Sequence, residues 1–139
     1  MKVYIGNRTI EDLSFKSLKD ISILKIVADD SECTTLVLDG ILKNYKISEI
    51  GDIINLAISK LRIGGELIIT DIDFDIMIFT HKKIGNLMEL NKMVESVDGF
   101  KSFLTYNMII DSLKSNNRLK LNSIDINNLE FKLSYKREL

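Results

Sequence analysis

Three aspartates at alternate positions, Asp71, Asp73 and Asp75, are the densest group of chemically useful side chains in this sequence. They follow an apolar run, Leu67–Ile69, whose length and composition are typical of a buried strand. Carboxylates that share one face of an extended segment can hold Mg²⁺ or Ca²⁺, or contact a substrate. They can also cap a following helix or line a hydrated cleft. No second acidic cluster is placed to complete a metal shell, so we expect no metal site.

Few other side chains offer chemistry. Asp39-Gly40 ends a second apolar run and is either a ligand contact or an ordinary turn, since both residue types favour turns. His81 can act as a general base, because the unperturbed pKa of histidine lies near neutrality, but its polar neighbours in the sequence favour an exposed surface histidine. Cys33 is a nucleophile only with a base beside it, and its position is more typical of a half-buried strand residue. One histidine and one cysteine do not make a zinc site.

The helix and the strand that precede the aspartates are clearly marked. Apolar residues recur at helical spacing over Ser48–Arg62, with Ser48 as a candidate N-cap. Gly64 and Gly65 can adopt the left-handed conformation that ends a helix, and the strand Glu66–Thr70 follows at once. Because ligands of open α/β sheets bind at the carboxyl ends of strands, this order places the aspartates where a ligand is expected.

The stretch Lys60–Asp73 resembles a segment of the class I S-adenosylmethionine (SAM)-dependent methyltransferases, in which a helix, a double glycine and an apolar strand precede an acidic residue. Asp30–Leu42 is similar to the family's fourth strand, and Lys2–Gly6 to its first strand with the first glycine of the SAM loop. Gly85–Asn91 is similar to a segment of small phage and bacterial members. The similarity runs in order through nearly the whole chain and implies a methyltransferase-type sheet.

The resemblance also implies SAM as the cofactor and a place for it. It puts SAM against Gly6 and Asn7, which follow the first strand. It further puts the cofactor against Asp29 and Asp30, with Asp39 near the methyl donor and acceptor. It places Asp71 and Asp73 beside the substrate, so these two residues are the candidate substrate contacts. In-line methyl transfer at such a site would depend mostly on the positioning of two reactants.

The first third of the sequence departs from the family pattern. Of the glycine-rich loop G-x-G-x-G only Gly6 is present, and such glycines let backbone N–H groups approach a cofactor closely. No acid is recognisable at the end of a second strand to hold the ribose hydroxyls. The interval from Gly6 to Asp29 is too short for the usual helix, strand, helix and strand, so we expect at least one helix and one strand to be missing. These losses should weaken SAM binding roughly a hundredfold or more.

Two hypotheses about function follow, and the sequence favours neither. In the first, the chain is a minimised, active methyltransferase whose substrate is not identified. In the second, it is a non-catalytic interaction or scaffold module on a methyltransferase-like fold that has lost SAM binding. A sheet without its flanking helices usually becomes an interface, and Phe74–Val97 is rich in apolar residues. We therefore expect a homo-oligomer, or a docked protein partner, through Phe74–Val97.

The composition is that of a single domain over residues 1–139. Hydrophobic residues make up 45% and charged residues 28% of the chain, which suits a well-packed core. The net charge is −1 with both signs interspersed, so we expect no nucleic-acid partner. We also expect no signal peptide and no membrane span. The single cysteine excludes an internal disulfide, which suits a reducing, cytoplasmic location.

The predicted fold class is α/β, with a Rossmann-like, mainly parallel sheet, an antiparallel last strand and a reduced N-terminal half. Thr9–Lys19 is expected to be irregular, and Asn127-Asn128 predicts a hairpin turn. The expected strands are Lys2–Ile5, Ile23–Ala28, Thr34–Asp39, Glu66–Thr70, Leu119–Ile124 and Leu129–Tyr135, and the expected helices are Ser48–Arg62, Thr105–Ser115 and one or two within Phe74–Val97.

Overall fold

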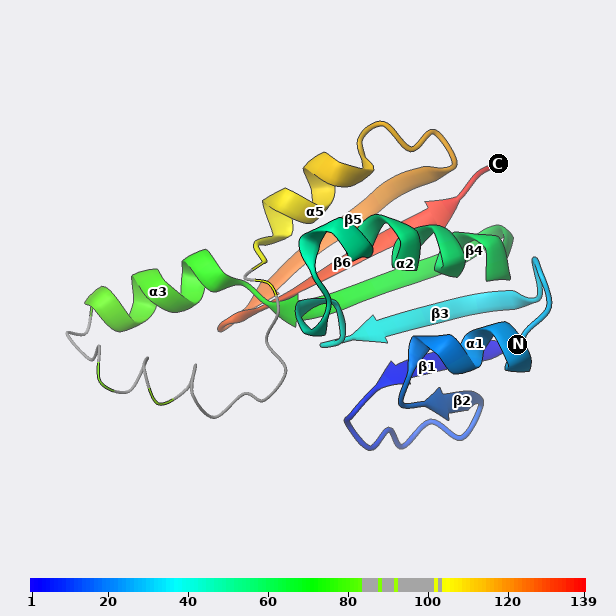
Figure 1. The fold of residues 1–139 in the computed structure, drawn as a ribbon, viewed down its shortest axis with the longest axis horizontal. Coiled ribbons are helices and arrows are strands. Elements are labelled where there is room, and N and C mark those ends of the chain that lie inside the picture. The colour runs from blue at the N-terminus through cyan, green and yellow to red at the C-terminus, as the bar shows by residue number, and fades with distance from the viewer. Residues whose placement is uncertain (84–87, 89–91, 93–101, 103) are drawn as a thin grey trace.

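The structure is a computed structural model that describes residues 1–83, 88, 92, 102 and 104–139. Its centre is one six-stranded sheet (Figure 1). The strand order is β2-β1-β3-β4-β6-β5. β1, β2, β3 and β4 all run parallel to one another, whereas β6 runs antiparallel to β4 and β5 antiparallel to β6. The predicted α/β class with a mainly parallel sheet is therefore confirmed. The strands are β1 (Lys2–Gly6), β2 (Phe15–Leu18), β3 (Cys33–Asp39), β4 (Leu61–Ile72), β5 (Leu119–Asn127) and β6 (Glu130–Arg137).

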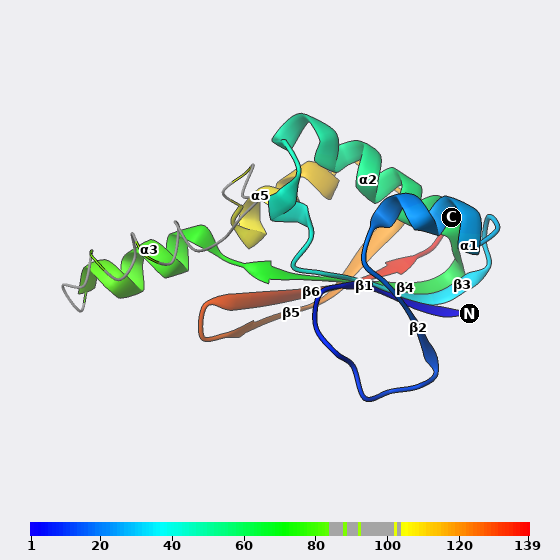
Figure 2. The ribbon, with the colours of Figure 1, turned by 60° about the horizontal axis from the view of Figure 1, so that its bottom comes forward.

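The described helices that pack on the sheet all lie on one face of it. The described helices are α1 (Leu24–Val27), α2 (Ile47–Lys60), α3 (Phe74–Lys83) and α5 (Tyr106–Leu113). α1, α2 and α5 lie on the same side of the strands, while the loop between β1 and β2 lies on the other side (Figure 2). α3 projects from the end of β4, away from the sheet (Figure 1). None of the described helices is long and apolar enough to cross a membrane.

α2 forms as predicted, because its apolar residues repeat at helical spacing and pack on the sheet. Its buried residues are Ile50, Ile53, Ile54, Ala57 and Ile58. The helix begins one residue earlier than expected. Lys46 is the N-cap, and the carboxylate of Glu49 accepts a hydrogen bond from the Lys46 backbone N–H (3.1 Å). Ser48 therefore lies inside the first turn and does not cap the helix.

The double glycine shapes β4 instead of ending α2, so that part of the prediction was wrong. Gly64 has φ +83° within β4. Residues 61–66 of β4 lie opposite only residues 33–35 of β3, so the strand bulges at the glycines. α2 ends earlier, at Lys60. The buried guanidinium of Arg137 donates hydrogen bonds to the carbonyl oxygens of Ile58 (2.9 Å) and Leu61 there, which satisfies groups that a helix end leaves unpaired.

The segment between β1 and β3 differs most from the prediction. Ile23–Ala28, expected as a strand, is helical, and α1 follows a 3₁₀ turn at Ile21–Ile23. The segment has strand-like residue types, but Ile21, Leu24 and Ala28 are the buried ones, and their spacing is helical. The strand beside β1 is β2, in a segment expected to be irregular. The whole interval thus holds one short strand and one short helix.

The C-terminal third follows the prediction closely. Thr105 caps α5, and its hydroxyl accepts a hydrogen bond from the backbone N–H of Met108 (3.2 Å). β5 and β6 form the expected hairpin, with Asn128 at φ +56° in its turn. In β6, Phe131, Leu133 and Tyr135 are buried, as the alternation of apolar and polar residues predicted.

α3 confirms the start of the helical region expected within Phe74–Val97. Most of the remainder of that range, including most of Gly85–Asn91, lies outside the described residues. Met77 is buried, whereas Phe79 is 66% exposed and Met88 72% exposed. An interface through Phe74–Val97 stays a prediction.

The face of the sheet without described helices is largely polar. Pairing places the apolar residues Val37 and Ile68 side by side at its middle. Around them lie mostly polar or charged residues, among them Lys2, Thr35, Asp39, Glu66, Thr70, Lys132, Ser134 and Lys136. Water can therefore cover this face, because alternate residues of the strands are mostly polar there.

Two glycines provide a test of the β4 bulge. A Cβ atom at Gly65 would lie 2.8 Å from the Arg62 carbonyl oxygen and 2.9 Å from Leu61 Cδ1. Gly65→Ala should therefore lower the free energy of unfolding by about 1–3 kcal/mol. A Cβ at Gly51, inside α2, would meet nothing within 4 Å, so Gly51→Ala should raise the free energy of unfolding by about 0.5–1 kcal/mol. Urea unfolding followed by circular dichroism measures both, and a neutral Gly65→Ala would contradict the tight bulge.

Candidate functional site

The carboxyl ends of β1, β2, β3 and β4 lie at one edge of the sheet, because these strands are parallel. From β1, the chain passes to β2 on one side and later to β3 on the other side. Such a reversal of strand order is where open α/β sheets bind their ligands, between the loops that follow the two strands. Gly6 ends β1 and pairs with Asp39, which ends β3. The structure therefore brings these two predicted site residues together.

Asp39 is the centre of a polar network on the face that carries no described helix. Its carboxylate accepts hydrogen bonds from the hydroxyls of Tyr4 and Thr70, the latter at 2.6 Å. Nε of Arg8 lies 3.4 Å from Oδ2 of Asp39, and the same guanidinium pairs with Glu130. Burial, together with the hydrogen bond to Asp39, raises the pKa of Tyr4 to about 12. Tyr4 therefore remains a neutral hydrogen-bond donor at physiological pH.

Gly6 is required by this network itself. A Cβ atom at this position would lie 2.7 Å from the hydroxyl oxygen of Tyr4 and 2.8 Å from the carbonyl oxygen of Asp39. The Tyr4 hydroxyl also accepts a hydrogen bond from the backbone N–H of Arg8 (3.3 Å). Asn7, between Gly6 and Arg8, is exposed. The start of the loop after β1 is thus held in place, with the Asn7 side chain available to a ligand.

Asp71 is buried on the opposite face, among the helices. Its carboxylate lies 3.3 Å from Nζ of Lys43 and accepts a hydrogen bond from the backbone N–H of Ile72 (2.8 Å). Lys43 also donates to the carbonyl oxygen of Gly40 (2.6 Å). Burial raises the pKa of Asp71, and the nearby Lys43 ammonium opposes that rise. The pair joins the loop after β3 to the end of β4.

The carboxylate of Asp73 accepts hydrogen bonds from the first turns of two helices. Its Oδ1 atom accepts a hydrogen bond from the backbone N–H of Ile76 in α3 (3.0 Å), and Oδ2 accepts one from the backbone N–H of Tyr106 in α5 (2.9 Å). The side chain is almost fully buried. The capping interpretation, considered alongside substrate contact, is therefore confirmed for Asp73. Substrate contact by Asp71 and Asp73 stays a prediction.

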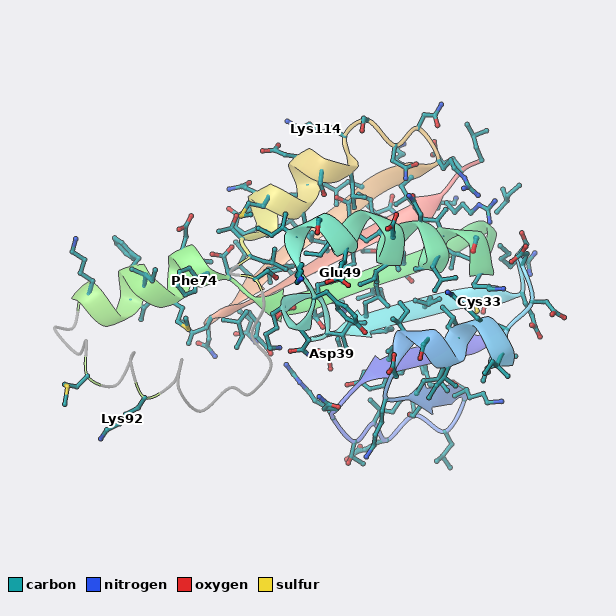
Figure 3. The ribbon with its side chains drawn as sticks, viewed as in Figure 1. Cys33, Asp39, Glu49, Phe74, Lys92 and Lys114 are labelled. Atoms are coloured by element: carbon teal, nitrogen blue, oxygen red, sulfur yellow. The ribbon has the colours of Figure 1, made fainter. Side chains whose placement is uncertain are left out.

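Asp29 and Asp30 lie at the other edge of the sheet. They precede β3, and Asp30 pairs with Lys60 at the end of α2 (2.9 Å). Figure 3 shows Cys33 and Asp39 at opposite ends of β3. At about 3.3 Å per residue, the two edges are separated by about 20 Å along this strand.

The expected single site that joins Gly6 to Asp29 and Asp30 is therefore not formed. The physical reason is the helical conformation of Ile23–Ala28. A parallel strand there would have delivered the two aspartates to the ligand-binding edge, whereas α1 returns the chain to the opposite edge, where β3 begins.

Asp20 is an acidic residue at the carboxyl edge of the sheet that was not among the residues expected from the sequence. β2 ends at Leu18, which pairs with Ile5, so Asp20 lies just beyond the carboxyl end of β2. Its side chain is exposed, and Oδ1 accepts a hydrogen bond from the backbone N–H of Ser22 (2.9 Å). β2 gave little signal because it has four residues and only Leu18 is buried.

Two of the hollows on the face without described helices adjoin, because Val37 lines both of them. Asp39 lines the smaller one. One, of about 220 Å³, is lined by Arg8, Val37, Asp39, Ile68, Thr70, Glu130 and Lys132. The other, of about 400 Å³, is lined by Tyr4, Ile10, Glu11, Asp12, Phe15 and Val37.

Cys33 and His81 are the remaining candidates. Cys33 is fully buried at the opposite end of β3, and burial raises the pKa of its thiol, so it suits a structural role. His81 lies in α3. Within the described part of the chain, no three His, Cys, Asp or Glu side chains are grouped closely enough to hold a metal ion.

The arrangement of strands and helices matches that of solved methyltransferases. An O-methyltransferase family protein from Burkholderia thailandensis has a TM-score of 0.62 at 11% identity, over 89% of this chain and 36% of that protein. A SAM-dependent methyltransferase from Methanosarcina mazei has a TM-score of 0.60 at 15% identity, over 90% and 67%. The magnesium protoporphyrin IX methyltransferase of Synechocystis, solved with bound SAH, has a TM-score of 0.55 at 16% identity, over 89% and 51%.

These likenesses establish a methyltransferase-like fold, as the sequence resemblance predicted. The chain spans between about a third and two thirds of the length of these three proteins. No protein-family model matches the sequence, and no curated protein matches it.

The capping role of Asp73 can be tested by comparing its substitution with the same substitution at Asp75. Asp73→Asn should lower the free energy of unfolding by about 1–3 kcal/mol, because an amide NH₂ would face one of the two backbone N–H groups. Asp75→Asn removes the same charge from an exposed position in the first turn of α3 and should cost no more than about 0.5 kcal/mol. Thermal and urea unfolding compare the two variants. Equal losses would show that Asp73 acts through its charge alone.

Proposed function

We propose that this chain is a SAM-dependent methyltransferase reduced to the core of its fold, with the cofactor held at the carboxyl edge between the loops after β1, β2 and β3. The observation that carries the proposal is the convergence of Gly6, Asp20 and Asp39-Gly40 at the reversal of strand order. The same fold occurs in proteins named as SAM-dependent methyltransferases, one of them solved with bound SAH.

Asp20 supplies the acid that the sequence seemed to lack. It follows the second strand of the sheet, the position at which the resemblance implies a carboxylate for the ribose hydroxyls. One of its oxygens already accepts a hydrogen bond from Ser22, and the side chain is exposed. Asp20 can therefore accept a further hydrogen bond from a bound ligand without leaving its place at the start of the helical turn.

Arg8 can bind the carboxylate of the cofactor. The loop after β1 leads into β2 with no helix between them, so a helix N-terminus is not available there to bind the carboxylate of the cofactor. The Arg8 side chain is 59% exposed and already pairs with two carboxylates. Exchange of Glu130 for the carboxylate of SAM would preserve a charge-assisted pair.

The chemistry asked of this site is modest. When bound, the cofactor supplies a methyl group activated by its sulfonium, and the protein contributes mainly by holding donor and acceptor in line. The hollow beside Asp39 leaves room for an acceptor. Arg8, Glu130 and Lys132 line it, so we expect a polar acceptor.

Calorimetric titration with SAM and with SAH tests the proposal. Because the loop has a single glycine and no following helix, we expect weak binding, with a dissociation constant between about 10 μM and 1 mM. Asp20→Asn should weaken binding about fivefold or more, since hydrogen bonds to a charged acceptor are among the stronger ones. Asp52→Asn, an equal charge change on the exposed side of α2, should leave it unchanged.

Two results would count against this account. A folded chain that binds neither ligand at millimolar concentration would favour the non-catalytic interaction module. Binding that is insensitive to Asp20→Asn would mean that the ribose lies elsewhere.

A further inference from the structure

Among the described strands, β5 forms one edge of the sheet, and it has few of the features that normally protect an edge strand. It is nine residues long and outermost in the strand order. Ile124 is 43% exposed and Ile126 49% exposed. Edge strands present unpaired backbone N–H and C=O groups, and most proteins guard them with proline, several lysines or a very short strand. β5 has no proline and a single lysine, Lys120, whereas the other edge strand, β2, has only four residues.

The side chains of β5 form a palindrome. Leu119–Asn122 has the order apolar, charged, apolar, polar, and Ser123–Ile126 has the order polar, apolar, charged, apolar. The two charged members, Lys120 and Asp125, are of opposite sign. A strand with this pattern is complementary to a second copy of itself that runs in the opposite direction.

An irregularity in β5 places the mirrored residues on matching faces. The register with β6 shifts between Leu121 and Ser123. Because of this shift, the four apolar residues Leu119, Leu121, Ile124 and Ile126 pair with Arg137, Tyr135, Leu133 and Phe131, which are alternate residues of β6. All four side chains therefore lie on the face that the helices cover. Because these residues pair with alternate residues of β6, their backbone N–H and C=O groups all point to the same side of β5. Lys120 and Asp125 lie on the other face.

We propose that two copies of this chain pair through β5, antiparallel, about a twofold axis between Asn122 and Ser123. The two six-stranded sheets then become one continuous sheet. Lys120 faces the partner's Asp125, Leu121 faces the partner's Ile124, and Leu119 faces the partner's Ile126. Twofold symmetry makes each of these contacts occur twice.

The charges within one chain support this pairing. Lys120 lies opposite Lys136 in the hairpin, a like-charge pair that is unfavourable across two strands. The partner's Asp125 would offset that repulsion. The same association would cover Ile124 and Ile126, the exposed apolar residues of β5. This surface is distinct from Phe74–Val97, where the sequence suggested an interface.

Charge exchange at the two mirrored positions tests the proposal. Size-exclusion chromatography with light scattering should show a dimer of the parent chain at high micromolar concentration. K120D puts two acids opposite each other at both symmetric contacts, and D125K does the same with two lysines. Each single variant should raise the dimer dissociation constant about tenfold or more. K25D and D52K, the same charge changes at exposed residues of α1 and α2, should dimerise like the parent.

Variants that restore the pairing of opposite charges distinguish this interface from any other. An equal mixture of K120D and D125K should form a heterodimer, because every contact then joins an acid to a lysine, and the double variant K120D/D125K should dimerise alone. Circular dichroism and thermal unfolding establish that each variant is folded. A parent that stays monomeric at high micromolar concentration, single variants that dimerise like the parent, or a mixture that does not associate would overturn the proposal.

Discussion

The parallel pairing of β3 with β4, closed by the crossover helix α2, holds the centre of this protein. Leu36 and Leu38 of β3 pair with Leu67 and Ile69 of β4, and all four side chains are completely buried. Since the described helices lie on that face alone (Figure 2), the opposite face has to be compatible with water. The carboxyl edge therefore has two unlike halves, with Asp71 among the buried residues and Asp39 on the polar face.

The contrast between the two faces determines which acidic residues are accessible to a ligand. Asp71 and Asp73 are buried, and their carboxylates hold neighbouring segments together through Lys43 and two helix starts. Asp39 is similarly engaged by Tyr4 and Thr70. The groups that remain accessible, among them Asn7 and Asp20, lie in loops after β1 and β2. The strands fix the geometry of the edge, and its loops offer the contacts for a cofactor.

The sequence predicts this fold best where periodicity is strong and contacts are local, as in α2 and in the C-terminal hairpin. The prediction fails where the structure depends on a residue that is distant in the sequence. Arg137 donates hydrogen bonds to carbonyl oxygens at the end of α2, which lies before the glycines that were expected to end the helix. Composition alone mistook Ile23–Ala28 for a strand, and that error also misplaced Asp29 and Asp30. Asp73 could not be assigned as a cap to α5 from sequence, because Tyr106 lies 33 residues away along the chain.

The proposed function requires that SAM binds at the carboxyl edge of the sheet, beside the loops after β1, β2 and β3. Two-dimensional ¹H–¹⁵N NMR of the labelled chain during titration with SAH tests it most directly, since the method locates weak binding as well as tight binding. Binding at this edge should shift mainly the backbone amides of Gly6, Asn7, Asp20 and Gly40, with those of Asp29 and Asp30 unchanged. Shifts confined to the edge that holds Asp29 and Asp30, or no shifts at millimolar SAH, would contradict it.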